Sequence, residues 1–428
     1  MQSVAARLKS HTANMAHEPV LQRDKHVRYW QRCHKTYLPS VYTSNDSTRV
    51  TFAYFIISAL DVLHVPLSAH DGTAIRRWIL GLQHPDGGFC GSPAHMPAGQ
   101  QPGSINGSAN LAATYFALLL LGAAAATDDE ARAAFACVRR KKLLRWLRTL
   151  QREDGSFGQL VWDGKAMGGH DVRHSYFASC VRWMLRDAAD QEDINLDTMV
   201  AYIRQGQTYD GGLAEASDHE SHAGYAYCGV AALYMLHRPC NERRDALKRG
   251  VAHDESLISF LIHRPFDYQA KEEEADEVGE NYIEAKLGQL GLCQASRHPT
   301  HIGYNGRCNK KADTCYCWWV AATLKMLGSL GLVDADSSRR YILDITQHRI
   351  GGFAKAVGRP PDIYHSYLGL AALALLDHKE LKPFDAGLCC SLDMARKIAL
   401  AREGADGARE TSFDEDGFWQ VAAQAYKE

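Results

Sequence analysis

Three side chains that commonly bind metal ions stand near the starts of two apolar segments late in the chain. Asp313 and Cys315 belong to the sequence DTCY, and His365 belongs to DIYHSY. One carboxylate, one thiolate and one imidazole suit a zinc ion and leave a fourth coordination position open, as in catalytic sites. Each residue alone also has an ordinary explanation, as a buried structural cysteine, a helix N-cap or a hydrogen-bonded histidine.

A second cluster could bind an anion. Arg307 and Lys310 lie in the Gly/Asn-rich turn GYNGRCNK, directly before the possible metal ligands, while His222 and Tyr316 stand near the starts of apolar segments. A basic loop is usually only a solvated surface. Beside a metal ion, however, these donors favour a clamp for an oxyanion or a diphosphate.

Composition sets limits on the class of protein. The chain has 428 residues, 46% of them hydrophobic and 23% charged, with a formal net charge of −2, so no global basic field favours nucleic acid. The N-terminus lacks the apolar core of a signal peptide, and the longest apolar stretch, 111–126, is shorter than the roughly 18–20 residues of a membrane span. Twelve irregularly spaced cysteines favour a reducing compartment. We therefore expect a cytoplasmic protein without a membrane span.

A repeat must position the candidate residues. Glycine-rich turns recur, each followed by an apolar, small-residue-rich helix, and more amphipathic helices lie between these units. A period of roughly 50 residues predicts units that bury their faces only against one another. We expect an all-α fold, an α/α barrel whose inner helices follow the turns. The turns are 82–91, 150–159, 208–216 and 349–357, with 303–310 as a divergent member.

Aligning the inner helices places four residues at one equivalent position: Asp171, His222, Asp313 and Asp362. The steps between them are 51, 91 and 49 residues, and the long step contains the charged run 271–281. We expect one domain over 1–428, with a core of about 22–400, an acidic insertion at about 268–300 and a mobile or partner-bound tail at about 401–428. In this alignment the first helical turns bring the polar residues to one rim, where helix N-termini favour anions. They are Arg173, His174, His222, Asp313, Cys315, Tyr316 and His365.

Three segments resemble the β subunits of protein prenyltransferases: ESHAGYAYCG, GYNGRCNKKADTCYCWWVAATLKML and GGFAKAVGRPPDIYHSYLGLAAL. The resemblance covers most of residues 22–378. It implies an α/α barrel with one zinc ion on Asp313, Cys315 and His365. It further implies diphosphate binding by His222, Arg307, Lys310 and Tyr316, contacts of Arg173 and Tyr176 near the isoprenoid, and Trp319 in the lipid pocket.

Within that family the resemblance favours the geranylgeranyltransferase type I branch. Thr51 stands where the farnesyl enzyme has a bulky tryptophan that shortens the lipid pocket. Lys355 stands where that enzyme has an aspartate that recruits magnesium, which implies no magnesium requirement here. Asn110 departs from the histidine expected in this branch, and with Ala112 it occupies the region that reads the last residue of the peptide.

The implied reaction transfers a C20 isoprenoid from geranylgeranyl diphosphate to the cysteine of a C-terminal CaaX motif, often with leucine last. Implied partners are an α subunit shared with the farnesyl enzyme and CaaX proteins such as Rho-family small GTPases. A farnesyltransferase β subunit is the nearest alternative, and a Rab-type enzyme fits less well. A terpene cyclase with the same barrel would need an acidic DxDD or DDxxD motif, and the nearest candidate, Asp128–Asp129–Glu130, lacks that spacing. A non-catalytic binding barrel would not need the aligned metal-binding residues.

Overall fold

The computed structural model describes residues 18–92, 108–186, 192–236, 245–268 and 300–403, together with Asp190 and Arg238. The expected acidic insertion and C-terminal tail lie almost wholly outside these residues. Among the described residues, no helix combines the length and apolar character needed to cross a bilayer.

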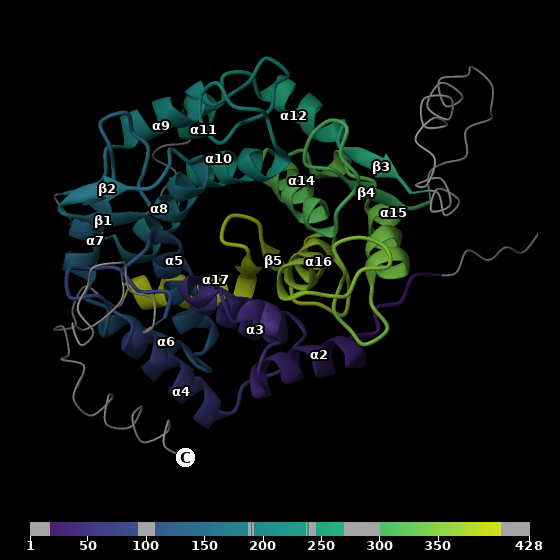
Figure 1. Cartoon of the computed structure of the whole chain (residues 1–428), viewed down its shortest axis with the longest axis horizontal. Helices are drawn as coiled ribbons and strands as arrows, with labels where there is room; N and C mark the ends of the chain where they lie inside the picture. Colours follow the sequence, from purple (N-terminus) through teal and green to yellow (C-terminus); the bar gives the residue numbers. More distant parts are fainter. Residues whose placement is uncertain are drawn as a thin grey trace, which may run out of the picture.

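Six helices form a closed inner ring (Figure 1). They are apolar around nearly their whole circumference, so they are stable only when neighbours cover them on every side. Each packs against the next along the chain, and α16 returns to pack against α3. The expected α/α barrel is therefore confirmed. The inner helices are α3 (Arg49–Val62), α5 (Leu111–Ala123), α8 (Val172–Leu185), α10 (Ala223–Met235), α14 (Thr314–Met326) and α16 (Ile363–Leu375).

An outer layer of more amphipathic helices covers this ring. In α7, for example, Leu143, Trp146 and Leu147 are buried while the opposite side is basic. Such a helix gains stability by covering the inner ring with one face and leaving the other in water. The outer elements are α2 (Arg23–Lys35), α4 (Ala69–Leu80), α6 (Asp128–Ala136), α7 (Arg140–Thr149), α9 (Leu196–Gln205), α11 (Asp245–Gly250), α12 (Asp254–Ile262), α15 (Ala335–Arg340) and the π-helical turn η6 (Tyr341–Thr346).

The glycine-rich turns join the two layers. At each of the four regular turns, the backbone of a glutamine forms an isolated antiparallel β-bridge with the residue six positions later. Each turn then leads into an inner helix. Gly351 shows why glycine is needed: its φ is +90°, and a Cβ there would lie 2.2 Å from the Lys25 carbonyl oxygen. The close approach of Gly351 to the Lys25 carbonyl holds the last turn against α2, the first outer helix, and so closes the barrel. His26 supports the same seam, because its Nδ1 accepts from Gly352 N–H at 3.1 Å and its Nε2 lies 2.9 Å from Gln347 Oε1.

Short antiparallel hairpins complete the fold. One of them, β5–β6, lies near the centre of the ring in the view of Figure 1, and α17 (Leu392–Glu403) follows it. The pairs are β1 (Leu160–Trp162) with β2 (Lys165–Met167), β3 (Pro265–Asp267) with β4 (Ile302–Tyr304), and β5 (Phe384–Asp385) with β6 (Cys390–Ser391).

Buried tyrosines from the inner helices hold the β5–β6 turn. Tyr54 and Tyr367 donate to the carbonyl oxygen of Cys389 at 2.7 and 2.6 Å. Tyr115 and Tyr227 donate to the carbonyls of Leu388 and Ala386 at 2.8 and 2.9 Å. These bonds satisfy turn carbonyls that would otherwise be buried without partners. The turn therefore closes the interior of the barrel at this level.

Candidate active site

The structure confirms the alignment of the inner helices. Asp171, His222, Asp313 and Asp362 are the N-caps of α8, α10, α14 and α16, and each side chain accepts a backbone N–H of the first turn. Asn110 caps α5 in the same way, accepting from Ala113 N–H at 2.7 Å, a role that the sequence analysis missed. The residues of successive first turns therefore lie at one end of the barrel.

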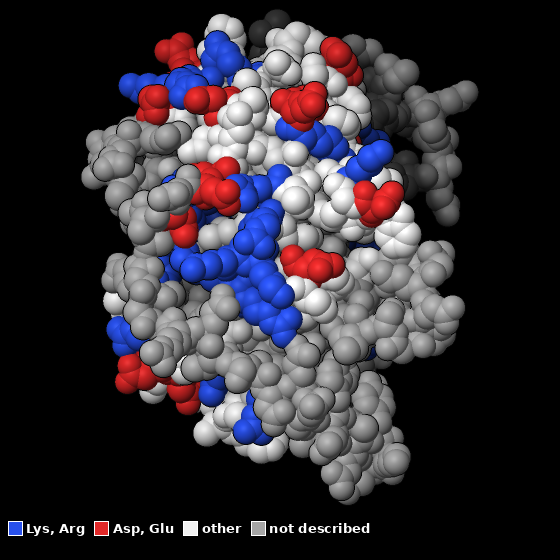
Figure 2. Space-filling view, turned by 90° about the vertical axis from the view of Figure 1, so that its left-hand side faces the viewer, with Lys and Arg blue, Asp and Glu red and all other residues white. Residues whose placement is uncertain are grey.

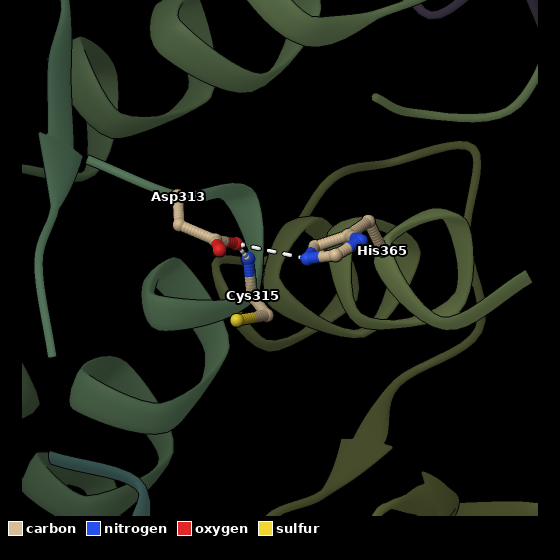
Figure 3. Close-up of side chains that lie close together, drawn as sticks. All are labelled: Asp313, Cys315 and His365. Atoms are coloured by element: carbon tan, nitrogen blue, oxygen red, sulfur yellow. Dashed lines mark hydrogen bonds and ion pairs between the residues drawn. The ribbon is translucent and has the colours of Figure 1, made fainter. Parts of the chain in front are cut away.

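Asp313, Cys315 and His365 meet there, as Figure 3 shows. Each offers one ligand atom, and the three atoms lie within 4.8 Å of one another. Oδ1 of Asp313 lies 3.1 Å from Nε2 of His365, and it also accepts the backbone N–H of Cys315 at 3.0 Å. The two segments separated in sequence are therefore side by side, and the three residues could hold a metal ion.

The protonation of this group reflects burial and mutual contact. Burial alone would raise the pKa of Asp313, but the hydrogen bonds from His365 and Cys315 hold it below its ordinary value. Burial would lower the pKa of His365, yet Asp313 and Asp362 outweigh it and raise that pKa to about 9. Burial and the Asp313 carboxylate raise the pKa of the Cys315 thiol well above normal. A cation would be needed to hold that sulfur as a thiolate.

Asp362 orients the histidine. Its Oδ1 accepts the His365 backbone N–H at 2.9 Å, and its Oδ2 lies 2.6 Å from His365 Nδ1. A carboxylate on Nδ1 leaves Nε2 free as the ligand atom and fixes the ring, as is usual for metal-binding histidines. The sequence analysis gave Asp362 a place in the alignment but no role toward His365. The sequence DIYH places a carboxylate three residues before a ligand histidine, and that spacing was the available signal.

The donor set fits zinc. Carboxylate oxygen, thiolate sulfur and imidazole nitrogen are all common ligands of that ion, and three protein ligands leave one position for a substrate. Asp313 and Cys315 are buried and His365 is half-buried, so water has limited access to the group. We find no feature of the three residues that opposes a zinc ion.

A cavity of about 1130 Å³ opens beside Asp313. Arg307, Lys310 and Lys355 line it, so the structure brings together cations predicted from distant parts of the chain. Arg307 pairs with Glu220 on the same cavity wall, and Lys355 Nζ lies 3.6 Å from Asp313 Oδ2. The sequence analysis missed two further cations and one carboxylate of this wall, which are Lys311, Arg359 and Glu220.

His222 and Tyr316 form a coupled pair on the same wall. Nδ1 of His222 accepts Gly224 N–H at 3.0 Å, so the neutral ring carries its proton on Nε2, which lies 2.8 Å from the Tyr316 oxygen. Burial, with Arg307 nearby, lowers the pKa of His222, and burial raises that of Tyr316. At neutral pH the histidine therefore donates to the tyrosine oxygen, and the tyrosine O–H is left to donate toward the cavity.

The residues expected near the isoprenoid, and Ala112, which is expected near the last residue of the peptide, occupy different depths. Thr51 and Ala112 lie half-buried in the first turns of α3 and α5. Arg173 pairs with Asp171 at 2.5 Å. Tyr176 is deeper and buried, with its hydroxyl 2.7 Å from that of Tyr115 and 3.2 Å from that of Tyr227. Half-buried Trp319 packs on the Tyr227 ring with centroids 4.8 Å apart.

The acidic run that a terpene cyclase would need lies elsewhere. Asp128, Asp129 and Glu130 form the first turn of the outer helix α6. They pair with Arg396, Arg132 and Arg76, which belong to α17, α6 and α4. All three carboxylates therefore form ion pairs with arginines of α17, α6 and α4.

Comparison with known proteins agrees with this geometry. The Prenyltransferase alpha-alpha toroid domain matches residues 21–390. The β subunit of geranylgeranyl transferase type-1 from Arabidopsis thaliana is 28% identical, and the match covers 85% of this chain and 87% of that subunit. The protein farnesyltransferase β subunit of Schizosaccharomyces pombe is 27% identical, over 82% and 78%.

A solved structure agrees as well. Candida albicans protein geranylgeranyltransferase-I, solved in complex with GGPP, superposes with a TM-score of 0.72 at 25% identity, covering 90% of this chain and 99% of that one. These matches confirm the resemblance to prenyltransferase β subunits and the enzyme class expected from it. The chain belongs to the prenyltransferase alpha-alpha toroid family.

Proposed function

We propose that this chain is the catalytic β subunit of a zinc-dependent protein geranylgeranyltransferase type I. It would transfer a C20 isoprenoid from geranylgeranyl diphosphate to the cysteine of a C-terminal CaaX motif. The observation that carries the proposal is the group of Asp313, Cys315 and His365 beside a cavity lined by cations. The reaction needs a thiol activator and an anion-binding wall next to each other.

The thiol half of the reaction depends on three ligands and their support. Asp313, Cys315 and His365 would hold zinc, and Asp362 keeps His365 in the orientation that presents Nε2. A bound zinc ion would supply the positive charge that keeps a substrate thiol as the nucleophilic thiolate at neutral pH. The burial of Asp313 and Cys315 would limit the access of water that competes for the fourth position.

The departure of the diphosphate depends on hydrogen-bond donors and cations that are positioned before the reaction. As the C–O bond of the diphosphate breaks, negative charge grows on the leaving oxygens, and preorganised donors lower that barrier. Arg307 and Lys310 would contact the diphosphate, with the O–H of Tyr316 held in place by His222. Exposed Lys355 reaches the same wall, and its ammonium would take the charge-neutralising role of a magnesium ion.

Lipid length would be selected inside the barrel. Each buried CH₂ contributes about 0.8 kcal/mol, so the five additional carbons of a C20 chain could contribute about 4 kcal/mol over a C15 chain. That gain requires an open cavity. Thr51 is a small residue in the first turn of an inner helix. It would leave space for the longer lipid that an aromatic side chain would fill.

The remaining parts of the proposal concern macromolecular partners. The named relatives are β subunits, so we propose that this chain works with an α subunit in a heterodimer. CaaX proteins, including Rho-family GTPases, would be the acceptors. Asn110 and Ala112 would contact the last residue of the peptide.

The test uses the purified heterodimer, with the two diphosphates competing for one acceptor peptide. We expect bound zinc, preference for the C20 lipid and turnover without magnesium. Thr51→Trp should shift the preference toward the C15 lipid, while the matched control Thr51→Ser should keep the C20 preference. A heterodimer that retains full zinc in both Cys315→Ala and His365→Ala would refute the metal site.

The second candidate is a farnesyltransferase β subunit, favoured by the 27% identical relative from Schizosaccharomyces pombe. The same competition separates the two. Preference for the C15 lipid together with dependence on added magnesium would favour the farnesyl reaction and refute the roles of Thr51 and Lys355.

A further inference from the structure

One outer helix, α7, carries a dense stripe of cations. The segment 139–148 contains six basic residues and no acidic residue. Because its apolar face is buried on the inner ring, Lys141, Lys142 and Arg145 project outward and are exposed. Figure 2, which looks at the edge of the barrel where Figure 1 places α7, shows a continuous patch of Lys and Arg at the middle of this face.

Among the residues that the structure describes, the outermost of these charges have no carboxylate partner. Arg140 pairs with Asp190 and Arg148 with Glu192, each at 2.5 Å. Within the described part of the chain, neither Lys141, Lys142 nor Arg145 forms an ion pair, and Lys142 only donates to a backbone carbonyl. The protein as a whole has a net charge of −2, so this local excess is not a consequence of composition. A concentrated positive face attracts an anionic partner.

The β1–β2 hairpin adds apolar side chains to the same edge of the barrel (Figure 1). Trp162 and Met167 are 43% and 46% exposed, and Lys165 stands opposite Trp162 in the pairing. The tight turn between the strands has φ of 48° at Asp163 and 69° at Gly164, which suits a two-residue hairpin.

The hairpin is anchored to α7. Arg152, just beyond the helix, donates from Nη2 to the Gly168 carbonyl at 2.6 Å, at the base of the second strand. The Leu150 carbonyl accepts Gly158 N–H at 2.8 Å. The cations and the exposed Trp162 therefore belong to one rigid surface. We call α7 and this hairpin together the basic edge.

We propose that the basic edge binds anionic membrane surfaces. Lys and Arg attract the negative headgroups, while tryptophan is the residue that sits best at the boundary between headgroups and acyl chains. An acidic protein partner would use the cations but would have no need for an exposed tryptophan at the tip of a hairpin. This combination is why we infer a lipid surface.

The expected strength follows from the number of charges. Each Lys or Arg at an anionic surface strengthens binding about fivefold, and the attraction decays within a Debye length of about 8–10 Å. Reversing Lys141 and Arg145 should therefore weaken binding about 25-fold or more. Trp162→Ala should weaken it by a smaller factor that persists at high salt, because its contribution is not electrostatic.

The test is cosedimentation of the heterodimer with vesicles, without lipid diphosphate or acceptor peptide, so its outcome does not depend on the transfer reaction. One set contains phosphatidylcholine alone, and the other contains about 30% phosphatidylserine. We expect binding to the second set only, which is lost between about 0.1 and about 0.5 M salt. Lys141→Glu with Arg145→Glu should abolish it.

A matched control reverses two exposed lysines elsewhere, Lys325 in the last turn of α14 and Lys379 beyond α16. This variant has the same net charge as the test variant and should bind like the parent. Equal loss in both variants would refute the basic edge as the binding surface. Unchanged vesicle binding by the Lys141/Arg145 variant would refute it as well. Loss of heterodimer assembly in that variant would also refute it, because this result would show that the face contacts a protein partner.

Discussion

Replacing Asp362 by asparagine tests the candidate metal centre at the residue behind a ligand. The wild-type carboxylate caps α16 with Oδ1 and accepts from His365 Nδ1 with Oδ2, at 2.9 and 2.6 Å. Asparagine has the same shape and can still cap with its oxygen. Its NH₂ group then faces the Nδ1–H of the histidine, so two donors meet and the ring loses its orienting acceptor.

The size of the effect follows from this loss. Removing a carboxylate that supports a ligand histidine typically weakens metal binding about 10- to 100-fold. That factor corresponds to about 1.4–2.7 kcal/mol of binding free energy. The fold itself should change little, because the cap is retained and the helix is buried on all sides.

The assay is competition between the purified heterodimer and a chromogenic chelator for zinc. Asp171→Asn is the matched control, since Asp171 caps α8 at the equivalent position but pairs with Arg173 and supports no histidine. We expect the control to retain parental zinc affinity, with circular dichroism showing the same helix content in all three proteins. Equal affinity of Asp362→Asn and the parent, or an equal loss in both variants, would refute the reasoning.

Four further predictions concern the buried contacts that hold the barrel together. Burial lowers the pKa of His26 from 6.5 to about 4, so the unfolded chain takes up a proton before the folded chain does as the pH falls. About 3 kcal/mol of the free energy of unfolding should therefore be lost between pH 6.5 and 4. Denaturant titrations should show a shallower pH dependence of stability in His26→Gln than in the parent. Tyr367→Phe leaves the buried Ser58 hydroxyl without its partner and removes one of the two donors to the Cys389 carbonyl, so it should cost about 1–3 kcal/mol in the same titrations. Tyr176→Phe should cost less, about 1 kcal/mol, because its two tyrosine partners keep their bonds to the hairpin; an equal cost would contradict the hydrogen-bond scheme. Gly351→Ala should lower the melting temperature, with a cost of about 2 kcal/mol or more, because it combines a positive φ with a clash at the Lys25 carbonyl.

The features that repeat were predictable from the sequence. Apolar helices that follow glycine-rich turns can be buried only in a closed ring of like units, and this is the observed fold. Alignment of the units also identified the shared cap position of Asp171, His222, Asp313 and Asp362, because one local problem, the unpaired N–H groups of a helix start, recurs in every unit. The meeting of Asp313 with His365 follows from that alignment.

Contacts made once in the chain were not predictable in this way. The β5–β6 turn has no counterpart in the repeat, so nothing in the sequence pattern indicated that buried tyrosines hold it. Tyr176 illustrates the difficulty, since a tyrosine in an apolar helix has the same sequence signature whether it lines a cavity or supports a neighbour. Glu220 was missed because its pairing with Arg307 depends on how two loops of different repeats approach each other.

The cap position also explains how a structural repeat can carry chemistry. A helix start needs only one acceptor atom, but each of these side chains has a second polar atom. In His222 the second atom contacts Tyr316, in Asp362 it orients His365, and in Asp171 it binds Arg173. The requirement for a cap therefore keeps a polar group at the rim of every unit, and the second atom can acquire a role without any cost to the helix. It follows that serine, a good cap with a single oxygen, should preserve the helices at these positions while removing the contacts at the rim.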